Sequence, residues 1–118
     1  MDNSKNYRKP KQISDLNILW AIRDIPRSIL NLSQKGILSM FLAIMGNKSS
    51  FSLSMKELEN KIGLTDANLI KQLHLLEDRC FIKINRPANY VKGQANEYFL
   101  NYVFILELAD KCRNESFV

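Results

Sequence analysis

The chain is poor in the residues from which metal centres and catalytic sites are built. It has two cysteines and one histidine among 118 residues, and its sequence shows no metal-ligand cluster, Ser/His/Asp set, paired carboxylates or phosphate-binding glycine loop. We therefore expect no enzyme and no bound cofactor or metal, with His74 as a partly exposed helix residue. Because Cys80 and Cys112 lie far apart without a partner motif, we expect two thiols in a reducing cytoplasm, and a structural disulfide is the less favoured alternative.

Long apolar segments are also scarce. The longest apolar run, GILSMFLAIMG at 36–46, is too short for a transmembrane helix, which needs about 20 residues. The segment 1–12, MDNSKNYRKPKQ, lacks the apolar centre of a signal peptide, and we expect it to be a disordered basic tail. The remainder, in a chain with 46% apolar residues, can supply one core. We expect a single domain over 13–101, a C-terminal helix over 102–113 and a short tail over 114–118.

Acidic residues are missing from one part of the chain. The net charge is +5. The segment 79–96 has no acid and four basic residues: Arg79, Lys83, Arg86 and Lys92. The N-terminal tail is also basic, whereas acids outnumber bases over 54–78. Clustered positive charge favours a polyanionic partner, although a solvated basic surface accounts for the charge equally well.

Helix and strand signals follow one another in a defined order. The patterns predict helices over 34–46, 55–61, 66–78 and 102–113, a strand over 51–53, and a hairpin over 81–100 whose returning strand is 97–100. Ser33 is the expected N-cap of the first helix, and Ser54 with Glu57 has the capping-box pattern for the second. Gly63 is expected to end that helix, and Thr65 is the next N-cap.

The segment 13–32 is apolar but interrupted by a proline. Pro26 fits the first turn of a short helix better than a helix interior. The element type over 15–23 stays open. We expect Trp20 to help cover the core.

The helix predicted over 34–46 has a wider apolar arc than one buried face needs. Its apolar residues are Ile37, Met40, Phe41 and Ile44 on the expected inward face, with Leu38, Leu42 and Met45 beside them. We favour a helix at the centre of the core, covered on two sides. The alternative is that the outer arc meets a second subunit.

The helix predicted over 66–78 has two distinct faces. Leu69, Leu73 and Leu76 recur at the spacing of one buried face. The outer face carries Asp66, Ala67, Asn68, Ile70, Lys71 and His74. A helix presented in this way, across a tight turn from another helix, is typical of the helix-turn-helix, whose second helix enters the major groove of DNA.

Several side chains near the start of this helix can contact DNA. Asn68 can pair with an adenine edge, and Lys71 can reach a guanine or a phosphate. Thr65 can donate its hydroxyl to a phosphate, and Ala67 belongs to the same expected contact set. Asp66 acts in the opposite sense, because its carboxylate repels phosphate unless it accepts from cytosine.

The hairpin tip over 85–96 combines basic and amide side chains. Lys83, Arg86 and Lys92 are its expected contacts to the DNA backbone or the minor groove. A solvated tip is the alternative, and the absence of acids over 79–96 favours DNA.

Four segments resemble the winged helix-turn-helix domain at the N-terminus of many phage and plasmid replication-initiation proteins. They are IRDIPRSIL (22–30), LSQKGILSMFLAIM (32–45), SMKELENKIGLTDANLIKQLHLLEDRCFI (54–82) and KGQANEYFLN (92–101). The resemblance covers about two thirds of the chain and implies a mainly α fold with a small β-hairpin, the winged helix-turn-helix, that binds double-stranded DNA. It also implies a role in plasmid or phage replication or in transcription.

The chain departs from the pattern of that family at informative positions. Gly36 replaces a small alanine, Cys80 stands where the family usually has glycine, and Asp66 stands where it has arginine or lysine. A single C-terminal helix follows where the family has a second region. We therefore expect a small regulator, similar to dimeric winged-helix repressors that form homodimers through terminal helices.

Two functions stay open on these grounds. The first is sequence-selective DNA binding, with the helix over 66–78 in the major groove. The second is a winged helix that serves as a protein–protein interaction module without DNA binding, which Asp66, Ile70 and Leu75 on the presented face favour. The salt dependence of duplex affinity separates the two, because phosphate contacts release counterions.

Overall fold

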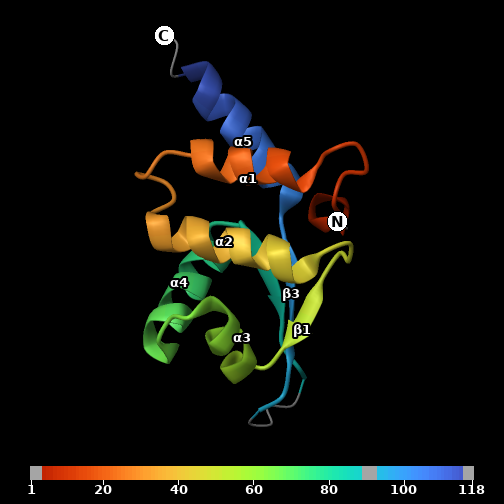
Figure 1. The fold of residues 1–118 in the computed structure, drawn as a ribbon, viewed down its shortest axis with the longest axis vertical. Coiled ribbons are helices and arrows are strands. Elements are labelled where there is room, and N and C mark those ends of the chain that lie inside the picture. Colours follow the sequence, from red (N-terminus) through yellow and green to blue (C-terminus); the bar gives the residue numbers. More distant parts are fainter. Residues whose placement is uncertain (1–3, 89–92, 116–118) are drawn as a thin grey trace.

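The fold is mainly helical with a small antiparallel sheet (Figure 1). The computed structural model describes residues 4–88 and 93–115. In chain order the elements are the 3-10 helix η1 (Ser4–Tyr7), α1 (Asp15–Asp24), α2 (Leu32–Met45), β1 (Phe51–Leu53), α3 (Met55–Ile62), α4 (Asp66–Asp78), β2 (Ile82–Asn85), β3 (Asn96–Leu100) and α5 (Tyr102–Glu115). The predicted class, mainly α with a small hairpin, is confirmed at this level.

The strands of the described residues form one three-stranded antiparallel sheet in the order β1-β3-β2. Tyr98 of β3 lies opposite Phe51 of β1 on one side and opposite Ile84 of β2 on the other. Because side chains alternate along a strand, Ile82 and Ile84 are buried while Lys83 between them is exposed. The predicted strand over 51–53 and the predicted hairpin are confirmed, and the returning strand β3 begins one residue earlier than expected.

α2 begins at Leu32, and this corrects its predicted cap. Asn31 is the N-cap: its side chain accepts from the backbone N–H of Gln34 at 2.8 Å, and the side chain of Gln34 accepts from the backbone N–H of Asn31 at 3.0 Å. Ser33, the expected cap, lies inside the first turn. The reciprocal capping box satisfies two backbone N–H groups, whereas a lone serine cap satisfies one.

α2 is the central helix of the fold and lies between α1 and the α3–α4 pair (Figure 1). Leu38, Leu42 and Met45, which make the apolar arc wide, are each at most 2% exposed. Met40 and Ile44 of the expected inward face are half-buried. The helix is therefore covered on two sides within the chain, which confirms the favoured interpretation: Leu38, Leu42 and Met45 of the outer arc are buried within the chain.

α1 occupies the segment whose element type the sequence left open. It buries Ile18 and Ile22. Trp20 was expected to help cover the core but is 46% exposed, because a residue two positions from Ile18 points to the other side of a helix. Pro26 begins a turn rather than a helix, and its carbonyl accepts from the backbone N–H of Ile29 at 2.9 Å.

α3 and α4 are joined by a three-residue turn, as predicted. Ser54 and Glu57 form the predicted capping box of α3, with distances of 3.0 and 3.2 Å. Gly63 ends α3 in the left-handed conformation at φ +81°. Thr65 is the N-cap of α4, although its side chain makes no capping hydrogen bond. The predicted range of α4 and its three buried leucines are confirmed.

The turn from α4 into β2 places Cys80 in the left-handed region, at φ +70°. The backbone N–H of Phe81 donates to the carbonyl of Leu76 at 2.9 Å, and that of Cys80 donates to Glu77 at 3.1 Å. These two bonds define a Schellman motif, in which glycine is the usual residue at the left-handed position. Asn101 fixes the same turn by donating its side-chain N–H to the carbonyl of Cys80 at 2.9 Å.

The N-terminal segment differs from the expected disorder where it is described. Ser4–Tyr7 forms η1, and the ring of Tyr7 meets Phe99 of β3 edge-on, with 6.2 Å between centroids. Lys9 forms an ion pair with Asp15 at the start of α1. The low apolar content of this segment predicts disorder, but the ring of Tyr7 packs against Phe99, which lies far along the chain.

α5 lies beside α1, at the end of the fold away from α3 (Figure 1). It begins where predicted and extends to Glu115. Tyr102, Ile105 and Ala109 are buried. Burial raises the pKa of Tyr102 to about 12.

Over residues 4–88 and 93–115, no helix has both the length and the apolar character to cross a bilayer.

Candidate nucleic-acid interface

α4 presents a row of side chains to solvent beside the β2–β3 hairpin. All the residues predicted for its outer face are exposed: Asp66, Ala67, Asn68, Ile70, Lys71 and His74. Because successive helix residues turn by about 100°, Ala67, Lys71 and His74 form the outermost stripe, opposite the buried leucines. Leu75, expected to point outward or sideways, is half-buried.

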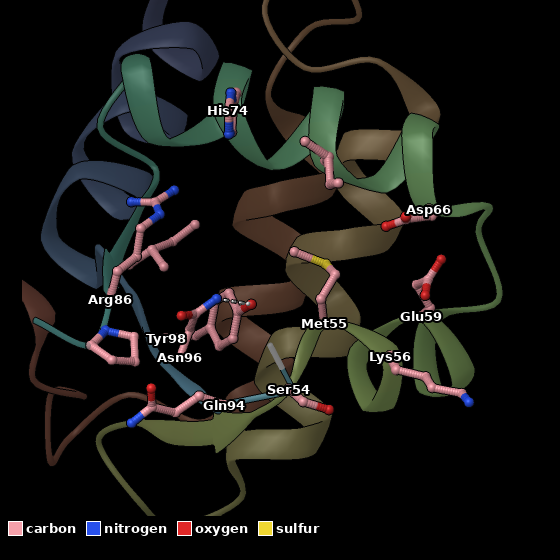
Figure 2. A pocket seen from close by; sticks show the side chains of 14 residues that line it. Ser54, Met55, Lys56, Glu59, Asp66, His74, Arg86, Gln94, Asn96 and Tyr98 are labelled. Atoms are coloured by element: carbon pink, nitrogen blue, oxygen red, sulfur yellow. Dashed lines mark hydrogen bonds between the residues drawn. The ribbon is translucent and has the colours of Figure 1, made fainter. Parts of the chain in front are cut away.

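A groove of about 510 Å³ lies between α4, the first turn of α3 and the hairpin (Figure 2). Its apolar lining comes from Met55, Ile70, Ile84 and Tyr98. The hydroxyl of Tyr98 accepts from the side chain of Asn96 at 3.3 Å, and burial raises the pKa of Tyr98. The volume is comparable to that of ligand-binding cavities, so the groove can receive part of a partner molecule.

Positive charge does not accumulate in this groove. Figure 2 shows Asp66 and Glu59 at one end and Arg86 at the other. The charged lining residues are thus two acids, Asp66 and Glu59, against two bases, Lys56 and Arg86. The groove itself therefore favours hydrogen-bonding and apolar contacts over a run of phosphates, and the outer stripe with Lys71 is the more basic part of the interface.

Arg86 is engaged within the protein. Its guanidinium nitrogens donate to both carboxylate oxygens of Glu77, at 2.9 and 3.0 Å. The side-chain hydrogen bonds from Arg86 hold the pKa of Glu77 below its ordinary value. This two-bond geometry is the specific form of a guanidinium–carboxylate pair, so Arg86 fastens the base of the hairpin to the last turn of α4.

Lys83 faces away from the groove. It lies on β2 between Ile82 and Ile84, which are buried on the other face of the sheet. Its Nζ is 5.6 Å from the ring centroid of Tyr7 and 5.5 Å from that of Phe99. Cation–π contacts of this kind hold the ammonium over the rings, so Lys83 belongs with the N-terminal segment rather than with α4.

Three side-chain amides connect the start of α2 to the outer face of α4. Gln34 is 2% exposed and Gln72 is 8% exposed. The Nε2 of Gln34 donates to the Oε1 of Gln72 at 3.1 Å. The Nε2 of Gln72 donates to the Oδ1 of Asn68 at 3.3 Å. Asn68, the last member, is exposed.

The structure brings together only part of the predicted DNA-contact set. Four of its residues lie at the start of α4: Thr65, Ala67, Asn68 and Lys71. Arg86 lies at the other end of the groove from Asp66, bonded to Glu77 of α4. Lys83 lies on the opposite face of the sheet, and Lys92 lies outside the described residues.

Sequence reasoning missed the groove lining and the amide chain. Met55 and Tyr98 come from separate elements, and no local pattern places them together. Gln72 did carry a signal, because it falls on the buried stripe, three residues after Leu69 and four before Leu76. A glutamine at such a position must find a hydrogen-bond partner inside the protein.

The described residues offer little other chemistry. Over 4–88 and 93–115, no group of three His, Cys, Asp or Glu side chains is arranged to hold a metal ion. Cys80 and Cys112 are separate thiols, the first exposed and the second half-buried. The candidate site is therefore the α4 face with its adjoining groove.

Comparison with protein families, with curated proteins and with solved structures gives no match to this chain. The likeness to replication-initiation proteins rests on the four sequence segments given above. The geometry of α4 and the hairpin is therefore the basis for inferring a function.

Proposed function

We propose that this chain is a winged helix-turn-helix protein that binds double-stranded DNA in a sequence-selective way. In this proposal α4 lies in the major groove and the β2–β3 hairpin is the wing. The single observation that carries the proposal is the exposed face of α4, which presents Asn68 and Lys71 to solvent. Control of plasmid or phage replication, or of transcription, is proposed from the sequence resemblance alone.

The first half of α4 supplies the proposed base and phosphate contacts. Lys71 on the outermost stripe is placed to reach a guanine or a phosphate, and Ala67 beside it can touch a thymine methyl group. The hydroxyl of Thr65 makes no capping hydrogen bond, so it suits a phosphate near the helix N-terminus. Asp66 faces the groove, to the side of the outermost stripe, which reduces its repulsion of phosphates along that stripe.

The hairpin has a different part in this proposal. Arg86 holds the wing against α4 through Glu77, so its first role is to set the position of the wing. Lys83 lies on the face of the sheet away from the groove, beside Tyr7 of the N-terminal segment. It would contact the DNA backbone only if the duplex also reached that segment. Lys92, outside the described residues, stays a predicted backbone contact.

Fluorescence anisotropy with a random-sequence duplex, at low and at physiological salt, tests the proposal. We expect binding that weakens steeply with salt, because phosphate contacts release counterions. Lys71→Ala is expected to weaken binding to all sequences and to lower the slope of log affinity against log salt by about 1. Lys111→Ala, on α5 at the far end of the fold (Figure 1), is the charge-matched control.

Either of two results would contradict the proposal. One is the absence of duplex binding at low salt. The other is an equal loss for Lys71→Ala and Lys111→Ala, which would indicate attraction by net charge alone rather than binding through α4.

A second candidate function is a protein–protein interaction module, and the groove favours it. Ile70 is 37% exposed and lines the groove with Met55 and Tyr98, while acids and bases balance around them. A protein docked there buries apolar surface, so its affinity persists at high salt. Salt-resistant binding that Ile70→Ser abolishes, together with no duplex binding, would favour this function over the first.

A homodimer joined by terminal helices is also part of the proposal. The apolar arc of α2 no longer supports it, because that arc is covered within the chain. Support comes instead from α1, where Leu16 is 51% exposed and Trp20 is 46% exposed. These two residues lie four positions apart and therefore on one helix face.

A further inference from the structure

The amide chain from Gln34 to Asn68 has a fixed direction. It starts at the backbone N–H of Asn31, which can only donate and which donates to the Oε1 of Gln34 at 3.0 Å. With its oxygen turned to that N–H, Gln34 must present its NH2 group to Gln72. Gln72 then accepts with its oxygen and donates with its nitrogen in turn. One backbone group therefore sets the orientation of all three side chains.

The direction of the chain decides which atom Asn68 shows to a partner. Its Oδ1 accepts from Gln72 and is turned toward the protein. The side-chain NH2 group is then the end of Asn68 that remains for the solvent side of α4, where the residue is exposed. An asparagine without such a neighbour can present either end, whereas this one is held in one orientation before a ligand arrives.

We propose that Asn68 is a dedicated hydrogen-bond donor that selects acceptor atoms on duplex DNA, with Gln34 and Gln72 as its positioning residues. The inference rests on the proposed function and refines it. Acceptors in the major groove of a duplex are the N7 and O6 of guanine, the N7 of adenine and the O4 of thymine, and the phosphate oxygens accept along its backbone. The pairing with an adenine edge expected from the sequence also uses the oxygen of Asn68 as an acceptor. That oxygen already accepts from Gln72 with one of its two lone pairs and is turned toward the protein.

A purely structural role for the two glutamines makes a different prediction. In that case the amides only tie α2 to α4, and their loss changes stability without changing which DNA groups are read. Buried amides cost free energy unless they are bonded, so both glutamines are replaced together and neither is left buried without the other. The backbone N–H of Asn31 also loses its bond to Gln34, but Asn31 is an exposed residue. The variant Gln34→Met/Gln72→Met does this with side chains of similar length.

The first experiment uses the free protein, and duplex binding does not enter it. Side-chain NH2 signals of 15N-labelled protein are followed by nuclear magnetic resonance. We expect the Asn68 NH2 group to be rigid in the parent chain and to become mobile in Gln34→Met/Gln72→Met, while the backbone spectrum keeps its dispersion. An Asn68 side chain equally mobile in both proteins would overturn the fixed orientation, whatever the outcome with DNA.

The second experiment uses double-mutant cycles between Asn68→Ala and single-group changes in DNA. A duplex chosen from a random pool by the parent protein is remade with 7-deazapurines, which lack N7, with methylphosphonates, which lack a phosphate oxygen charge, or with purine in place of adenine, which lacks the N6 amine. We expect an about tenfold coupling to one acceptor change, the size of one good base contact. The 7-deazapurine and methylphosphonate arms distinguish a base from a phosphate.

The outcomes separate this inference from the proposed function. A coupling between Asn68 and an acceptor group, whose free energy falls toward zero in Gln34→Met/Gln72→Met, supports both the proposed function and this inference. Duplex binding with coupling to the adenine N6 amine, or with no coupling to any acceptor, overturns the donor role while the proposed function stands. Complete absence of duplex binding contradicts the proposed function, and with it the DNA part of this inference.

Discussion

At Cys80 the backbone has a conformation that a residue with a β-carbon adopts at a cost. The left-handed region costs about 1–2 kcal/mol for such residues, and the φ of Cys80 is +70°. We expect Cys80→Gly to raise the free energy of unfolding by up to about 1 kcal/mol, since part of the gain is offset by the greater freedom of glycine in the unfolded chain. Urea unfolding at neutral pH measures the difference.

The second cysteine provides a control, because its replacement by glycine is expected to lower the free energy of unfolding. Cys112 lies inside α5, where glycine is expected to cost about 1 kcal/mol. A stability loss in both Cys80→Gly and Cys112→Gly would show that the thiol of Cys80, rather than its backbone, determines the effect.

The pair of Glu77 and Arg86 gives stability a defined pH dependence. The pKa of Glu77 is lowered in the folded state, first by its hydrogen bonds from Arg86. Its contribution is therefore present above the unfolded pKa of about 4.3 and is lost as pH falls through the folded pKa. Because the pair is partly exposed, we expect Glu77→Gln to cost at most about 1 kcal/mol at pH 7.

Unfolding of the parent chain and of Glu77→Gln at pH 7 and at pH 3 tests this. The difference between the two proteins should shrink as the pH falls. Glu107→Gln, on the exposed side of α5, controls for removal of one negative charge. A difference as large at pH 3 as at pH 7 would mean that packing rather than charge accounts for the effect.

Among the elements, the N-terminal segment contacts the sheet through the ring of Tyr7, and the strength of this contact can be measured. Tyr7 meets Phe99 edge-on, and such aromatic pairs contribute about 0.5–1.5 kcal/mol beyond their buried area. We expect a coupling energy of that size in the cycle Tyr7→Leu, Phe99→Leu and the double variant, measured by urea unfolding. Additive losses in the double variant would mean that the two rings do not interact in solution.

The element ranges near α4 were predictable because their signals are local. Ser54 with Glu57, Gly63 and Thr65 mark helix ends within a few residues of each other. The start of α2 was predicted wrongly because asparagine and serine both cap helices, and the choice depended on the reach of the Gln34 side chain.

The candidate site was predictable only in part, because its geometry depends on contacts between elements. The exposed face of α4 follows from helical spacing alone. The pairing of Arg86 with Glu77 and the position of Lys83 over Tyr7 join different elements, and composition cannot indicate that a basic residue is already engaged. The same holds for Asn68, whose orientation depends on α2.

At the scale of the whole molecule, the two candidate interaction surfaces are well separated. α1 and α5 lie together at one end, whereas α3 and α4 lie near the other (Figure 1). A homodimer through Leu16 and Trp20 would therefore leave both copies of α4 accessible. Sedimentation velocity over a range of concentrations tests the dimer, and we expect Leu16→Ser/Trp20→Ser to be monomeric throughout.

The dimer test needs a control variant that removes an exposed apolar side chain elsewhere on the surface. Leu32→Ser removes a side chain that is 83% exposed at the start of α2, and it should leave the dimer intact. A parent chain that is monomeric at every concentration would remove the dimer from the proposal, without bearing on α4.

The double use of Gln34 has a consequence for communication across the fold. The same side chain completes the cap of α2 and begins the amide chain to Asn68, so the start of one helix and the surface of another share a residue. By thermodynamic reciprocity, a ligand that stabilises the hydrogen bond between Gln72 and Asn68 also stabilises the N-cap of α2. Hydrogen exchange at the backbone amide of Asn31, a residue remote in sequence from α4, would then report on occupancy of the α4 face.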